Sequence, residues 1–179
     1  MDYRNLLKNN LSRNLIDNIA LTVYDDVANF QTVFDLIFDK DEKVAWRAAW
    51  ACEKMIQKFP EFIDEIKKMQ ITNLALTTKY EGIRRLSLSI LLSLPISSTI
   101  NVDLINTCFE WMLSDKQPIA VQSLSLKLLV RFCKIEPDLK PELIAYLENF
   151  DSDLLAPGMI SSRRNALKEL NKNLLHKPV

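Results

Sequence analysis

Apolar residues recur along this chain at the spacing of an amphipathic helix, and the same set returns after a constant step. Between residues 83 and 94 the apolar and small positions follow the order i, i+3, i+4, i+7 and i+11, and a step of 38 residues leads to a second such set. The two sets are Ile83, Leu86, Ser87, Ile90 and Leu94, and Val121, Leu124, Ser125, Leu128 and Phe132. The same step backwards reaches Ala45, Ala48, Ala49, Cys52 and Ile56. A helical spacing that returns at a fixed period predicts an all-α chain of stacked helical repeats.

A second series of apolar positions, with a step of 39 residues, marks a first helix in each repeat. It runs through Val27, Ile66, Ile105 and Ile144. Together the series predict four helix pairs over residues 27–58, 60–94, 101–135 and 137–175, in a single domain of residues 1–179. Residues 1–24 do not fit the repeat, and we expect them to form an N-terminal cap because a stack must cover its open end. The fourth pair follows at an offset of 42 through Ala166, Leu167, Leu170 and Leu174, with Arg163 at a position that is apolar elsewhere.

Three short motifs stand just before the second helices. Each has a side-chain acceptor followed three residues later by Glu or Gln: Asp39 and Glu42, Thr78 and Glu81, and Ser114 and Gln117. This is the pattern of a capping box, in which the first residue occupies the N-cap of a helix. We therefore expect Asp39, Thr78 and Ser114 to act as N-caps just ahead of the second helices.

The composition argues against several classes of function. Two glycines among 179 residues are too few for the loops that cradle phosphates, so no nucleotide cofactor is expected. The single histidine, His176, leaves no His-based triad and no multi-His metal site. Cys52, Cys108 and Cys133 lie within apolar helical patterns without C-x-x-C spacing, and we expect reduced core residues. We predict no catalytic residue, no metal and no cofactor.

The apolar segments are too short for a membrane protein. The N-terminal residues alternate charged and apolar side chains, and the longest apolar run covers only residues 86–96. A helix that spans a bilayer needs about 20 apolar residues. We expect a soluble, cytoplasmic protein with no membrane association.

A formal net charge of zero hides an unequal distribution of charge. The predicted second helices, residues 42–58, 81–94, 115–135 and 157–175, carry a net charge of +9, and the first helices, residues 25–39, 60–80, 101–114 and 137–151, carry −9. At 100° per residue the cations form a row off the apolar stripe, made of Arg47, Arg85, Lys127 and Arg131. Such a row favours an anionic partner. The ordinary interpretation of such a row is a solvated face partly paired with the acids of the first helices.

Two tryptophans on one predicted helix are the other candidates for binding. Trp50 aligns with a leucine in each of the next two repeats, which favours packing between repeats. Trp46 aligns instead with Arg84 and Gln122, both polar. We expect Trp46 to be the more exposed of the two, in a place where it can stack on a base or hold a ligand.

The repeat length and the second-helix pattern resemble HEAT repeats over roughly residues 27–175. HEAT-like second helices often carry V-R-x-x-A. The motifs I-R-x-x-S at residues 83–87 and V-Q-x-x-S at residues 121–125 are similar to it, while residues 45–49 have A-W-x-x-A. The resemblance implies a right-handed α-α solenoid whose second helices line the concave side. It therefore implies a basic concave face and an acidic back.

A non-enzymatic protein-interaction or scaffold module is the function that this resemblance favours, with an acidic protein partner on the basic face. The candidate binding residues are Trp46, Arg47, Arg84, Arg85, Lys127 and Arg131. Nucleic-acid binding on the same face stays open as the alternative. The DNA alkylation repair glycosylases are also HEAT-like, and Trp46, Trp50 and Glu53 loosely resemble their set of tryptophans and an acidic residue. A monomer and a homodimer both remain open.

Overall fold

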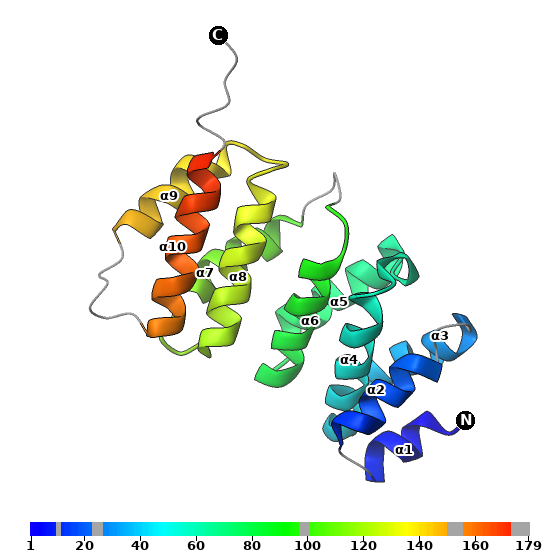
Figure 1. Cartoon of the computed structure of the whole chain (residues 1–179). Coiled ribbons are helices and arrows are strands. Elements are labelled where there is room, and N and C mark those ends of the chain that lie inside the picture. The colour runs from blue at the N-terminus through cyan, green and yellow to red at the C-terminus, as the bar shows by residue number, and fades with distance from the viewer. Residues whose placement is uncertain (10–11, 23–26, 97–100, 150–155, 173–179) are drawn as a thin grey trace. The chain divides into compact units, whose positions relative to one another are not determined.

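A computed structural model describes residues 1–9, 12–22, 27–96, 101–149 and 156–172 (Figure 1). These residues form α-helices and two short 3-10 helices, and no β-strand is found among them. The α-helices are α1 (Tyr3–Asn9), α2 (Arg13–Thr22), α3 (Val27–Asp35), α4 (Glu42–Ile56), α5 (Glu65–Thr77), α6 (Glu81–Ser93), α7 (Val102–Leu113), α8 (Ile119–Phe132), α9 (Leu139–Glu148) and α10 (Pro157–Lys172), and the 3-10 helices are η1 (Leu36–Phe38) and η2 (Pro60–Phe62). The predicted all-α fold is confirmed.

The helices belong to two compact units, an N-terminal unit of Met1–Pro95 and a C-terminal unit of Ile96–Val179. In the N-terminal unit α3 with η1 pairs with α4, α5 pairs with α6, α4 packs against α6, and α1 and α2 pack on α4. In the C-terminal unit α7 pairs with α8, α9 pairs with α10, and α8 packs against α10. In this unit α8 and α10 form one layer and α7 and α9 the other (Figure 1).

This order of helices confirms the prediction of an N-terminal helical cap followed by four helix pairs. One part of that prediction is not covered. Leu174, the end of the fourth pair at residue 175 and His176 lie outside the described residues.

Small residues at the repeated positions let the second helices pack closely. Ala48 and Ala49 on α4, and the matching Ser87 on α6 and Ser125 on α8, are almost fully buried. Most of the other predicted positions are buried as well, whereas Leu124, Phe132 and Leu167 are half-buried. An alanine or serine at the centre of a helix face leaves room for a neighbouring helix and fills it without a cavity. The helical period in the sequence thus corresponds to the packed side of α4, α6 and α8.

The first-helix series is only partly right, because Val27 and Ile66 are exposed. Both stand in the first turn of their helices, α3 and α5, before the backbone reaches the core. The buried positions of these helices follow later, at Phe30, Val33 and Phe34 in α3 and at Ile71, Thr72 and Ala75 in α5. Ile105 is buried as predicted.

The prediction that residues 39, 78 and 114 occupy helix N-caps is wrong. The second helices begin at Glu42, Glu81 and Ile119, and their N-cap positions are Asp41, Tyr80 and Pro118. The acceptor side chains bond to backbone N–H groups two residues ahead: Asp39 Oδ1 accepts from Asp41 N (2.8 Å), Thr78 Oγ1 from Tyr80 N (3.1 Å) and Ser114 Oγ from Lys116 N (3.3 Å). This is the geometry of a side-chain-stabilised turn. The three motifs therefore shape the turn inside each helix pair and do not open the second helix.

Candidate functional site

The second helices of the C-terminal unit carry most of its positive charge. The two helices carry six cations and one carboxylate, that of Glu169. The cations are Lys127 and Arg131 on α8, and Arg163, Arg164, Lys168 and Lys172 on α10. Four of the six are exposed, namely Lys127, Arg164, Lys168 and Lys172. We call these four residues the basic face. Because Arg164, Lys168 and Lys172 are spaced by four, they line one side of α10.

Contacts between polar side chains join α8 to α10 beside the basic face. The hydroxyls of Ser123 and Ser162 are 2.7 Å apart, and Ser162 Oγ also donates to the carbonyl of Gly158 at 2.9 Å. Because a serine hydroxyl has one proton, Ser123 is the donor in the first of these bonds. At the other end, Lys134 Nζ lies 2.7 Å from Glu169 Oε1. The one carboxylate of α10 is therefore engaged by a cation that directly follows α8.

Two residues of the predicted cation row lie in this unit, and they differ in exposure. Lys127 and Arg131 are one helical turn apart on α8, Lys127 exposed and Arg131 half-buried. Burial lowers the pKa of Arg131 because desolvation disfavours its charged form. Lys127 is the better placed of the two to meet a partner in solvent.

Arg163 has a polar role at a repeat position that is apolar in the other helix pairs. It was aligned with apolar positions, but Arg163 Nε donates to the carbonyl of Leu147 (2.5 Å), and Nη2 lies 3.4 Å from the carbonyl of Glu148. These carbonyls end α9, where the backbone has no further helical N–H to accept from. A cation at this end of a helix is also favoured by the helix dipole. Arg163 thus caps the first helix of its own pair.

Arg84 and Gln122 perform a related task in the two preceding pairs. Arg84 Nη2 donates to the carbonyl of Thr78 at 2.6 Å, directly after α5. Gln122 Nε2 donates to the carbonyls of Ser114 (3.0 Å) and Gln117 (2.8 Å), directly after α7. The polar position of the V-R-x-x-A pattern therefore ties the second helix to the turn that precedes it.

Arg47 holds the N-terminal cap in place. Its Nη1 donates to the carbonyls of Leu7 (2.5 Å) and Lys8 (3.0 Å) near the end of α1. In the first turn of α1, Arg4 makes two bonds to the carboxylate of Asp39, at 2.7 and 3.1 Å, which lowers the pKa of Asp39. Two arginines therefore fix α1, and the guanidinium of Arg47 faces a helix end.

The two tryptophans are both half-buried, so the expectation that Trp46 is the more exposed of the two stays a prediction. Their ring centroids are 5.8 Å apart with the planes tilted by 34°. Trp46 lies over Gly82 at the start of α6, close enough that an ideal Cβ there would be 3.0 Å from its Cδ1 and Nε1 atoms. Nearby on the same two helices, Ser89 Oγ donates to Glu53 Oε1 at 2.5 Å. Arg85, also half-buried, stands on α6 one turn beyond Gly82.

The predicted binding residues thus have different surroundings within their units. Arg47 and Arg84 bond to backbone carbonyls, Trp46 lies over Gly82 at the start of α6, and Arg85 stands on α6 itself. Three residues of the basic face, Arg164, Lys168 and Lys172, were not singled out from the sequence. Their spacing of four within a predicted helix places them on one side of it, and this signal could have identified them from the sequence.

The cysteines are all free and buried. Burial raises the pKa of the Cys52 thiol above its ordinary range, that of Cys108 to about 12 and that of Cys133 to about 11. A thiol with such a pKa stays protonated near neutrality and is a poor nucleophile. In the part of the chain that the structure describes, no three His, Cys, Asp or Glu side chains are grouped to hold a metal ion. No helix in those ranges is long and apolar enough to cross a membrane.

Comparison with known proteins gives one family. A family model described as HEAT repeat domain matches residues 3–170, which is nearly the whole chain. No curated protein matches the chain, and no similarity to a DNA glycosylase is found. The helix pairs, the close packing of their second helices and this match agree: the chain belongs to the HEAT repeat domain family.

Proposed function

We propose that the protein is a non-enzymatic interaction module whose basic face binds an acidic segment of a partner protein. HEAT repeat domains generally mediate protein interaction or scaffolding and are typically non-enzymatic. The observation that carries the proposal is the state of the four cations of the basic face. All four are exposed, and no side chain among them makes a hydrogen bond or an ion pair with another described residue.

The electrostatics of α8 and α10 support this choice of partner. The only carboxylate on these two helices, Glu169, is already bonded to Lys134. Positive charge that is not compensated locally attracts an anionic partner and speeds its association. A solvated face also carries free cations and gives no specific binding. An experiment must therefore show that these positions, and not net charge alone, bind the partner.

Two further candidate contact residues belong to the N-terminal unit. Trp46 and Arg85 belong to the residue types that dominate binding energy at protein interfaces. Each is half-buried, so part of its surface faces solvent. Arg47 and Arg84 act indirectly, by holding α1 and the turn before α6.

The test is a fluorescence-anisotropy titration with a labelled glutamate-rich peptide at low and physiological salt. The Lys127→Glu/Lys168→Glu variant reverses two charges of the basic face. The matched control is Lys40→Glu/Lys79→Glu, which changes net charge equally at two exposed lysines in turns of the N-terminal unit. We expect the first variant to bind about tenfold more weakly, since two lost charge pairs of up to about 1 kcal/mol each correspond to a loss of up to about thirtyfold. The control should bind within about twofold of wild type.

Equal loss in both variants, or no binding by the wild type, overturns the proposal. Single-stranded DNA, duplex DNA and RNA are titrated in parallel. Tighter binding of one of these, with affinity that falls steeply as salt rises, puts nucleic-acid binding first because neutralised phosphates release counterions.

A further inference from the structure

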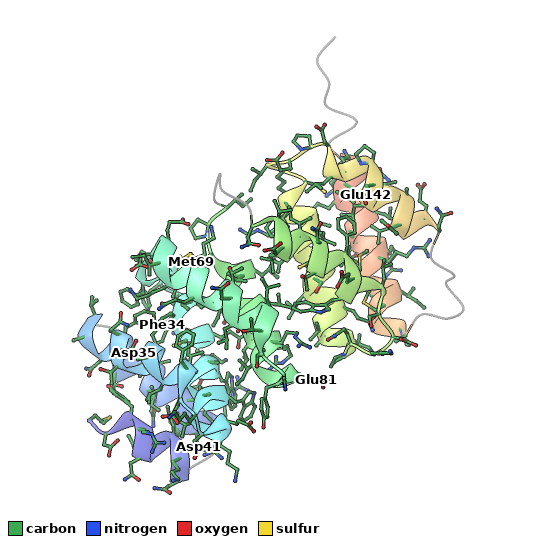
Figure 2. All side chains as sticks on the ribbon, turned by 180° about the vertical axis from the view of Figure 1, so that it is seen from behind. Phe34, Asp35, Asp41, Met69, Glu81 and Glu142 are labelled. Carbon is green, nitrogen blue, oxygen red and sulfur yellow. The ribbon has the colours of Figure 1, made fainter. Side chains whose placement is uncertain are left out.

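The layer of α7 and α9 presents an apolar seam to solvent on the side away from the basic face. Phe109 on α7 and Tyr146 on α9 bring their rings to a centroid distance of 5.5 Å. Tyr146 of this pair is 42% exposed, and on α7 Val102 and Leu113 are 65% and 42% exposed. Figure 2 shows this side of the unit, with Glu142 labelled on α9. Large apolar side chains grouped at a surface are typical of an interface.

Carboxylates flank the seam. Asp103 and Glu110 on α7 and Glu142 on α9 are exposed, and Lys140 is the only cation in the two helices. We call this surface the acidic face; it comprises Val102, Asp103, Glu110, Leu113, Glu142 and Tyr146. An apolar centre with a polar rim is the usual anatomy of a protein interface.

The basic face complements this surface in both charge and polarity. Ile160 stands one turn before Arg164, so it extends the line of Arg164, Lys168 and Lys172 along α10, and it is 40% exposed. Both surfaces therefore combine exposed apolar groups with charge, and the charges are opposite. The chain has no net charge that would hold copies apart.

We infer that the acidic face of one copy docks on the basic face of a second copy. The inference rests on the proposed function in one respect, since both use the basic face. Because the two surfaces belong to opposite layers of one unit, the contact joins unlike patches and leaves one free patch at each end. A contact of this kind continues into chains of copies unless it closes into a ring. Self-association should therefore grow with protein concentration and pass beyond the dimer.

Sedimentation velocity of the full chain tests this over a range of concentrations. At low salt, with a Debye length of about 30 Å, we expect the mean mass to rise with concentration. At about 1 M salt the Debye length is about 3 Å and the mass should fall to that of the monomer. A wild-type monomer at low salt, or a dimer that resists salt and does not grow, overturns the inference.

Two charge-reversed variants identify the faces. Lys127→Glu/Lys168→Glu changes the basic face, and Glu110→Lys/Glu142→Lys changes the acidic face; all four positions are exposed, so circular dichroism should show unchanged helix content. Each variant alone should stay monomeric at low salt. Their mixture should associate, because the first retains an intact acidic face and the second an intact basic face. Association that survives in both single variants, or no association in the mixture, refutes the assignment.

The glutamate-rich peptide separates this inference from the proposed function. Glu110→Lys/Glu142→Lys retains the basic face and should bind the peptide as tightly as the wild type. A wild type that binds the peptide but stays monomeric rejects the second-copy partner and leaves the proposed function standing. A wild type that neither binds the peptide nor self-associates rejects the proposed function and the inference together.

Discussion

The indole of Trp46 covers the backbone of Gly82. A Cβ at Gly82 would stand 3.0 Å from two atoms of that ring. Gly82 does not adopt a positive φ angle, so a left-handed backbone is not the reason for the glycine. The close approach of Trp46 to the first turn of α6 is the feature that a side chain would disturb.

Gly82→Ala should destabilise the protein by about 1 kcal/mol. Overpacking costs about 1–3 kcal/mol, and the alanine recovers about 0.5–1 kcal/mol of helix propensity. Denaturant unfolding measures the difference. Trp46→Leu should reduce the cost of Gly82→Ala in a double-mutant cycle, because the ring that clashes is removed.

Gly158→Ala is the matched control, at the same place in α10. Its Cβ would meet only Cγ2 of Ile119, at 3.1 Å, and Ile119 is an exposed side chain that can move. We expect a change between zero and a gain of about 0.5 kcal/mol. If Gly158→Ala cost as much as Gly82→Ala, the contact with Trp46 would not be the cause.

Arg47→Met should loosen the N-terminal cap. The methionine retains an apolar stem but loses the donors to the carbonyls of Leu7 and Lys8. Hydrogen bonds from a charged donor contribute about 1.5–3 kcal/mol, and we expect a loss of this size in the stability of α1. Hydrogen exchange of the α1 amides measures it directly. Arg4→Met removes the ion pair of a surface arginine and should cost less than Arg47→Met, because solvent screens an exposed pair; a larger effect than that of Arg47→Met contradicts the prediction.

Arg84→Gln should preserve the fold, since Gln122 performs the same task at the equivalent position. Arg84→Leu leaves the carbonyl of Thr78 without this donor and should cost about 1–3 kcal/mol. Thermal unfolding compares the two variants.

The Arg84→Gln variant also tests binding without loss of structure: we expect its affinity for the glutamate-rich peptide to stay within about twofold of wild type. A clear loss of affinity there, against an unchanged Arg85→Gln, would assign Arg84 to the binding surface.

Cys133 should be the first cysteine to react with a disulfide reagent in the native protein. It is 8% exposed, whereas Cys52 and Cys108 are fully buried. With a pKa of about 11, only about one Cys133 thiol in a thousand is ionised at pH 8. The reaction should therefore be slow and accelerate about tenfold per pH unit between pH 7 and 9, because the thiolate is the nucleophile. Cys133→Ser should abolish this phase, and a plateau below pH 9 would show that the pKa is not raised.

The sequence by itself determined the all-α class, the helix pairs and the period of the repeat. These properties are local, because a helix that buries one side must place apolar residues every three or four positions. The cations of α10 were accessible in the same way, since a spacing of four defines one side of a helix. A pattern that fits two local structures could not be assigned from the sequence alone. Asp39, Thr78 and Ser114 fit a capping box but form turns two to four residues before the N-caps.

The tertiary structure decided which polar residues face solvent. Arg47 and Arg85 belong to one row by helical angle, yet Arg47 bonds to carbonyls of α1, about 40 residues earlier in the chain. The partner of Trp46 is a glycine in the next helix pair, and the partners of Arg163 end the preceding helix. Helical periodicity gives the direction of a side chain relative to the axis of its own helix. It contains no information on which backbone groups of another segment lie next to that side chain. An unsatisfied carbonyl at a helix end is such a partner, and only packing of the helices brings it within reach of an arginine.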